Sequence, residues 1–196
     1  MTARPVAVAI TGGIGSGKSE ALKAFARHGA ATVSSDEIVH HLLRHPEVRE
    51  RVVDRVGNGV LAPDGEIDRT ALATTVFNDR EALAFLEELL HPLVAAEYLQ
   101  WREDLARLPD PPRVCVTEVP LLYEVGGDTR FDKVVVITAP TKLRRARSEL
   151  AVDERESRLL PEREKVARAD FAYTNTGTIE ELDAFVAGVM RALQPG

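Results

Sequence analysis

Cysteine, aromatic residues and long apolar runs are all scarce in this sequence of 196 residues. The single cysteine, Cys115, excludes an intrachain disulfide framework, and its apolar neighbours favour a core residue over a catalytic thiol. The first eleven residues hold only a short apolar run, too short for a signal peptide or a membrane span, so we expect a cytoplasmic protein without a membrane partner. Hydrophobic residues still make up 44% of the chain, which is enough for a buried core.

An excess of positive charge is also missing. The formal net charge is −6 and the isoelectric point is about 5.5. Because nucleic-acid binders usually carry a basic stripe, we expect no nucleic-acid partner. The densest basic run, at 142–147, is better interpreted as a local anion site. The oligomeric state is left open by the sequence.

Short apolar runs alternate with amphipathic stretches along most of the chain. We expect strands at 6–10, 31–33, 114–119, 134–137 and 171–174. We expect helices at 19–27, 36–43, 46–56, 69–77, 80–108, 142–165 (broken at 161) and 179–193, with a kink or a division of the long one at Pro92. Strands that alternate with helices predict a three-layer α/β/α fold around a central parallel sheet.

The middle of the chain is richer in helix than its two ends. We expect a core formed by about 1–45 and 113–196, interrupted by a helical insertion at about 46–112. No Gly/Ser-rich linker flanks the insertion, so we interpret it as an insertion within a single domain and not as an independent domain.

Residues 12–19 read GGIGSGKS and match G-x-x-x-x-G-K-[ST], the phosphate-binding P-loop. Glycines let successive backbone N–H groups point inward, and the helix that follows adds its positive end to the same anion site. The alternative, a chance glycine-rich turn, is much weaker because an apolar strand precedes the motif and an amphipathic helix follows it. The motif therefore predicts a P-loop NTPase-type core.

The residues that we expect to bind ATP follow from this motif. They are Gly13, Ile14, Gly15, Ser16, Gly17, Lys18, Ser19 and Glu20. Lys18 can reach the outer phosphates as a catalytic cation, and the hydroxyl of Ser19 can ligate Mg²⁺. The carboxylate of Glu20 must point away from the phosphates, because it would otherwise oppose their binding.

A P-loop alone leaves GTPases, ATPases and kinases open. The helical insertion and the arginine-rich late segment favour a small-molecule kinase, because an acceptor needs its own pocket and the transferred charge needs cations that close over it. A GTPase would show an N-K-x-D-like motif after a strand, whereas Asn175 is followed by threonine and glycine.

Ordered motifs over nearly the whole chain resemble the dephospho-coenzyme A kinase family. After the loop they are found at 36–38, 59–61 with 64–69, 76–77 with 86–94, 120–124 with 131–132, and 164–171 with 175–177. The resemblance implies transfer of the ATP γ-phosphate to the ribose 3′-hydroxyl of dephospho-coenzyme A, the last step of coenzyme A synthesis. It also implies that the insertion binds the substrate and that a helical lid lies at about 141–165.

The resemblance assigns further roles position by position. Asp36 matches the acidic residue near the acceptor hydroxyl, where a carboxylate can accept a proton, although an Asp there can also cap a helix. Arg69, His91 and Glu124 match substrate-side positions; a surface ion pair, a core imidazole and a solvated carboxylate are the respective alternatives. Asn175 matches the residue beside the adenine of ATP, and its alternative is a turn residue.

The lid and two acidic positions depart from the family pattern. Glu118 and Ser34 stand where the family usually has aspartates, and the longer Glu118 suggests a water-mediated contact to Mg²⁺. Arg147 matches the first lid arginine and is our third catalytic candidate. The next lid positions carry Ala151 and Leu159 in place of arginine and glutamine. Other lid cations that we consider are Arg144, Arg145, Arg155 and Arg158.

The atypical lid motivates two alternatives to this kinase. One is a nucleotide- or coenzyme A-binding module with a degenerate lid. The other is a P-loop kinase that acts on another small nucleotide or alcohol. In the kinase interpretation ATP and Mg²⁺ are the cofactors, and dephospho-coenzyme A is the small-molecule partner.

Overall fold

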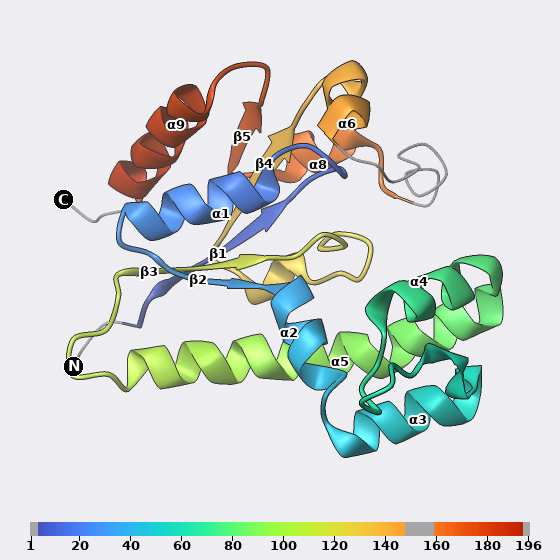
Figure 1. Cartoon of the computed structure of the whole chain (residues 1–196). Coiled ribbons are helices and arrows are strands. Elements are labelled where there is room, and N and C mark those ends of the chain that lie inside the picture. The colour runs from blue at the N-terminus through green and yellow to red at the C-terminus, as the bar shows by residue number, and fades with distance from the viewer. Residues whose placement is uncertain (1–3, 148–158, 194–196) are drawn as a thin grey trace. The chain divides into compact units, whose positions relative to one another are not determined.

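A computed structural model describes residues 4–147 and 159–193 of the chain (Figure 1). Within these residues, five parallel strands form one sheet in the order β2-β3-β1-β4-β5. The strands are β1 (Val6–Thr11), β2 (Ala31–Ser34), β3 (Val114–Glu118), β4 (Lys133–Thr138) and β5 (Phe171–Thr174). Each expected strand is present with its ends within one residue, so the predicted parallel sheet is confirmed.

Apolar side chains cover both faces of the central strand, β1. On one face, Val8 and Ile10 belong to a buried cluster with Phe25 of α1 (Lys18–Arg27) and Val186 of α9 (Ile179–Ala192). These two helices lie side by side over that face (Figure 1). On the other face, Ala9 belongs to a second buried cluster with residues that follow β3. The predicted three-layer arrangement is therefore confirmed.

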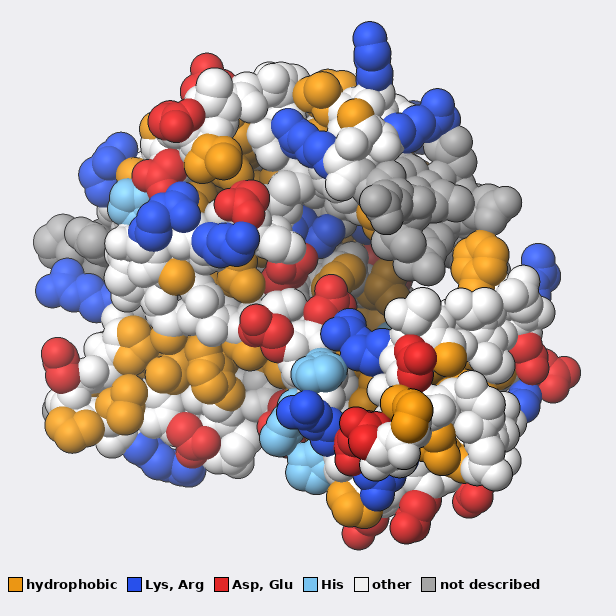
Figure 2. Space-filling model, viewed as in Figure 1, with side chains coloured by type: hydrophobic (Ala, Val, Ile, Leu, Met, Phe, Trp, Pro, Cys, Tyr) orange, Lys and Arg blue, Asp and Glu red, His pale blue; other side chains and the backbone are white. Residues whose placement is uncertain are grey.

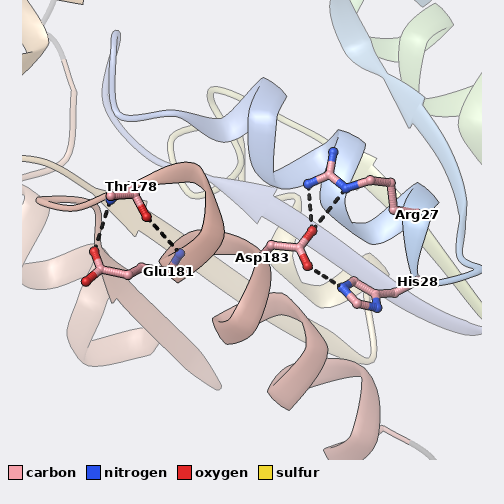
Figure 3. Close-up of polar contacts among 5 residues, drawn as sticks. All are labelled: Arg27, His28, Thr178, Glu181 and Asp183. Carbon is pink, nitrogen blue, oxygen red and sulfur yellow. Dashed lines mark hydrogen bonds and ion pairs between the residues drawn. The ribbon is translucent and has the colours of Figure 1, made fainter.

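A surface cluster joins the end of α1 to α9 (Figure 3). Arg27 donates to Asp183 Oδ1 through Nη2 at 2.6 Å, and His28 Nε2 lies 2.9 Å from Asp183 Oδ2. α9 itself begins with a reciprocal capping box, in which Thr178 Oγ1 accepts from Glu181 N and Glu181 accepts from Thr178 N. The cluster thus connects the C-terminal end of α1 to α9 at the surface.

Residues 35–100 form a compact unit of their own, and the rest of the described chain forms the other. We call these the helical unit and the core unit. The first holds α2 (Ser35–Leu42), α3 (Pro46–Val56), the 3₁₀ turn η1 (Asn58–Val60), α4 (Arg69–Asn78) and most of α5 (Arg80–Ala106).

Residues at the N-termini of two helices in the helical unit favour the start of a helix there: Pro46 occupies the first turn of α3, and Asp68 caps α4 by accepting from two backbone N–H groups. The core unit also contains η2 (Asp128–Arg130), α6 (Thr141–Arg147) and α8 (Glu162–Arg168).

Pro92 does not divide the long helix, which runs without a break from Arg80 to Ala106. A proline inside a helix removes one backbone hydrogen bond and costs about 3 kcal/mol. Buried side chains on both sides of it, among them Leu89 and Val94, make continuation of the helix favourable. The possible division at this residue was therefore wrong. Among the described helices, none is long and apolar enough to cross a membrane.

Candidate active site

The loop between β1 and α1 owes its shape to three glycines. Gly12, Gly15 and Gly17 have φ angles of 147°, 72° and 101°, values that side chains with a β carbon rarely adopt. Gly17 is the residue before the first helical position, Lys18. The backbone thus curls through the loop and ends at the positive end of α1, as an anion site of this type requires.

Three separate elements close against these glycines. A β carbon at Gly12 would overlap the carbonyl oxygen of Ile137 in β4, and one at Gly15 would lie 2.6 Å from the carbonyl oxygen of Arg144 in α6. A β carbon at Gly17 would overlap the amide nitrogen of Asn175, just after β5. The motif therefore serves close packing as well as backbone conformation.

Lys18 and Ser19 follow the loop at the start of α1. Lys18 Nζ donates to the carbonyl oxygen of Gly13 at 3.1 Å, which places its ammonium group over the loop. Ser19 Oγ lies 3.4 Å from Glu118 Oε2. Glu118 ends β3 and is 5% exposed, and the register of the sheet sets it opposite Ile10 of β1. A hydroxyl and a carboxylate thus meet at the exits of two neighbouring strands.

The oxygens of Ser19 and Glu118 fit a magnesium ion. Mg²⁺ prefers oxygen ligands and usually combines one or two of them from the protein with phosphates and water. Glu20, the next residue of α1, pairs instead with Lys23 at 2.7 Å. Its carboxylate is therefore engaged along the helix, which agrees with the requirement that it point away from a bound phosphate.

A cavity of about 120 Å³ lies beside the loop. Its lining consists of Gly13, Arg144, Leu159, Leu160, Pro161, Glu162 and Lys165. Arg144 and Lys165 are 7% and 3% exposed, so two buried cations lie next to a main-chain anion site. Elsewhere, positive and negative side chains are interspersed on the face that Figure 2 shows.

Glu124, a predicted substrate-side residue, takes part in a buried ion pair. Its Oε1 lies 2.7 Å from Lys165 Nζ and accepts from the backbone N–H of Leu160 at 3.0 Å. The pair joins the segment after β3 to the middle of α8 and thereby supports one wall of the cavity. Contact of Glu124 with the substrate stays a prediction.

Asn175, the predicted adenine-side residue, is buried against the loop. Its backbone N–H donates to Thr138 O at 2.7 Å, and its Nδ2 donates to Ser16 O at 2.9 Å. This contact joins residues 159 positions apart. The contact with adenine stays a prediction, whereas the contact with the loop was not foreseen from the sequence.

The other predicted residues lie on helices. Asp36 is exposed in the first turn of α2, Arg69 is exposed at the start of α4, and His91 is half-buried in α5. All three belong to the helical unit. Arg147 is exposed at the end of α6 in the core unit. Three lid positions named above, Ala151, Arg155 and Arg158, lie outside the described residues.

Cys115 behaves as the sequence suggested. It lies in β3 and is 1% exposed. Burial raises the pKa of its thiol to about 11, so the thiolate needed for nucleophilic chemistry is disfavoured at neutral pH. We therefore assign Cys115 to the core.

A P-loop at the exit of the central strand, with a carboxylate at the exit of the next strand, defines this chain as a P-loop NTPase-type protein. A shikimate kinase from Aquifex aeolicus has the same fold, with a TM-score of 0.55 over 95% of this chain and 97% of that one, at 16% identity.

The family follows from closer likenesses. The model of the dephospho-CoA kinase family matches residues 6–181, and the chain belongs to that family. A dephospho-CoA kinase of Symbiobacterium thermophilum is 39% identical over 94% of this chain and 80% of its own length. One from Chlamydia pneumoniae is 38% identical over 95% and 96%, respectively.

Two solved structures agree with this assignment. A Thermus thermophilus protein is 32% identical, with a TM-score of 0.78 over 98% of this chain and all of that one. A dephospho-CoA kinase from Campylobacter jejuni is 26% identical, with a TM-score of 0.68 over 99% and 100%. Membership confirms the predicted activity, ATP-dependent phosphorylation of dephospho-CoA in coenzyme A biosynthesis.

Proposed function

We propose that the chain transfers the γ-phosphoryl group of ATP, bound with Mg²⁺, to the ribose 3′-hydroxyl of dephospho-CoA, with Asp36 as the proton acceptor. The observation that carries the proposal is the curled loop at the exit of β1, with Lys18 above it and Ser19 beside Glu118. The same proposal includes a cytoplasmic location and no nucleic-acid or membrane partner; the net charge of −6 supports the expectation of no nucleic-acid partner.

On the nucleotide side, the main chain binds the polyphosphate. The N–H groups of the loop and of the first turn of α1 donate to phosphate oxygens. Lys18 exchanges the neutral carbonyl of Gly13 for an anionic phosphate oxygen, which is the stronger acceptor. Ser19 and Glu118 would hold Mg²⁺, whose positive charge would offset the charge of the outer phosphates.

On the acceptor side, a carboxylate deprotonates an alcohol. The 3′-oxygen forms a bond to the γ-phosphorus, its proton passes to a carboxylate oxygen of Asp36, and the bond from that phosphorus to the bridging oxygen of ADP breaks. Arg147 contacts the transferring group as a cation. Arg69 and His91 orient the substrate.

The test is an ADP-release assay with purified protein, ATP, Mg²⁺ and dephospho-CoA. We expect turnover that needs both substrates, and mass spectrometry should find coenzyme A as the product. Coenzyme A serves as the matched control acceptor. Its ribose 3′-oxygen already carries a phosphate, so coenzyme A should not be phosphorylated.

Three results would count against the proposal. Phosphorylation of coenzyme A would place the transfer at another hydroxyl. Binding of both ligands without product would favour the binding module with a degenerate lid. Faster turnover of another small alcohol or nucleotide in a substrate panel would favour a different kinase.

A further inference from the structure

The buried side chain of Asn175 touches the phosphate-binding loop at one peptide group, the group between Ser16 and Gly17. Asn175 is 6% exposed, and its Nδ2 donates to the carbonyl oxygen of Ser16 at 2.9 Å. Its own backbone is fixed by the bond from its N–H to Thr138 O, at the end of β4. The main chain of Asn175 is therefore fixed to the sheet, and its side-chain amide holds the loop.

This contact fixes the orientation of a peptide plane. In a trans peptide the C=O and the N–H point in opposite directions. While the carbonyl of Ser16 points at Asn175, the N–H of Gly17 points to the opposite side of the loop. The plane needs such a restraint, because glycine adopts positive and negative φ angles with similar ease. A flipped plane would turn a carbonyl oxygen toward the bound anion.

The packing around Gly17 supports the same interpretation. A β carbon at Gly17 would overlap Asn175 Nδ2, so the glycine of the motif leaves room for this amide. Gly17 permits either orientation of the Ser16–Gly17 peptide plane, and the amide of Asn175 selects one of them.

We propose that Asn175 is a positioning residue for the polyphosphate of ATP, which it serves by holding the Ser16–Gly17 peptide with its N–H toward the phosphates. The inference rests on the proposed function, because it assumes that ATP occupies the loop. This positioning role and the predicted role beside adenine differ in which part of the nucleotide a substitution of Asn175 should affect. A residue that reads adenine affects the base, whereas one that positions the loop affects the phosphates.

The experiment therefore uses a ligand that has phosphates and no base. Binding of inorganic tripolyphosphate and of ATP is measured for the wild type, Asn175→Asp and Asn175→Leu, together with kcat/KM for ATP and for GTP. Both substitutions remove the donor, and only the first adds a charge. We expect each variant to weaken ATP and tripolyphosphate by the same factor, about 10- to 100-fold, with an unchanged ratio of ATP to GTP use and an unchanged KM for dephospho-CoA.

Asn78→Asp is the matched control. Asn78 Nδ2 also donates to a backbone carbonyl at 2.9 Å, that of Thr74, but does so on the exposed surface of α4. The same loss of a donor and the same added charge should leave binding of both ligands unchanged. Thermal unfolding of each variant shows whether it is folded before binding is compared.

Several outcomes would overturn the inference. One is an Asn175 variant that loses affinity for ATP but not for tripolyphosphate, and another is one that changes the ratio of ATP to GTP use; both would favour the adenine role. Folded variants with unchanged affinity for both ligands would exclude either role. A wild-type protein that binds neither ligand would instead refute the proposed function, so the two failures are distinguishable.

Discussion

The core unit and the helical unit differ in how they hold their candidate residues. In the core unit the site is mostly main chain, curled by three glycines and supported by Glu118, Asn175 and Lys165, each less than 10% exposed. In the helical unit the candidates Asp36 and Arg69 are exposed side chains in the first turns of helices. The fold thus fixes the loop that we expect to bind the nucleotide, whereas the proposed acceptor site depends on side chains at a helix surface.

The sharpest test of this contrast is Asp36→Asn. Loss of the proton acceptor should lower kcat about 10²- to 10⁴-fold, while affinity for ATP stays unchanged because the loop is untouched. Steady-state kinetics and calorimetric ATP binding measure the two quantities.

Glu37→Gln provides the control, since Glu37 is an exposed acidic residue in the same turn of α2. Its kcat should stay within a few-fold of the wild type. An Asp36→Asn enzyme with nearly full kcat would remove Asp36 from the mechanism and leave the helical unit without an assigned base.

Lys18→Ala should affect the nucleotide side in a different way. The ammonium group lies over the loop, so its loss should weaken ATP binding and lower kcat/KM about 10²- to 10³-fold. Lys23→Ala, one turn further along α1, removes an exposed lysine that pairs with Glu20 and should change neither quantity. Equal effects of the two substitutions would mean that general charge, and not the position of Lys18, attracts the nucleotide.

The shape and place of the phosphate-binding loop could be predicted from the sequence because the information is local. A loop of eight residues contains the glycines, the lysine and the serine, and the flanking apolar pattern places it between a strand and a helix. The glycines permit the curled backbone that an anion site of this type requires. The order of short apolar runs and helices likewise predicted the parallel sheet.

The supporting contacts could not be predicted in this way. Asn175 meets Ser16 across 159 positions, and Glu124 meets Lys165 only because the segment after β3 lies beside α8. A division of the long helix at Pro92, one of the two outcomes that we considered, does not occur because tertiary packing outweighs the local cost of a proline. Contacts set by the fold leave no pattern in a single sequence.

Glu124→Gln tests whether that residue stabilises the core unit or contacts the substrate. It removes the partner of Lys165, which is 3% exposed, and should cost about 2–4 kcal/mol of the free energy of unfolding. Urea denaturation measures this loss, and the KM for dephospho-CoA should stay unchanged.

Glu164→Gln is the corresponding control, because Glu164 is exposed beside Lys165 in α8. We expect it to leave the free energy of unfolding nearly unchanged. The opposite result for Glu124→Gln, a raised KM with full stability, would return Glu124 to the substrate side, as the family resemblance implied.

The smallest expected effect concerns Asp183, far along the chain from the loop motif. Hydrogen bonds from Arg27 and then from His28 lower the pKa of its carboxyl group below the ordinary 3.8. Since the unfolded chain then takes up the proton more readily, the contribution to stability is present above pH 3.8 and disappears as the pH falls through the lower, folded-state pKa. Asp183→Asn should lower Tm by about 1–3 °C at pH 7, a small change because exposed ion pairs contribute little, and by less near pH 3, where the carboxyl group of the wild type is partly protonated in the unfolded chain.

Asp110→Asn, in the exposed loop before β3, is the control and should show no such pH dependence. ATP affinity should be the same for both variants, because this cluster lies at the opposite end of α1 from the loop; a loss of ATP affinity in Asp183→Asn would show that the register of α1 and α9 contributes to the nucleotide site.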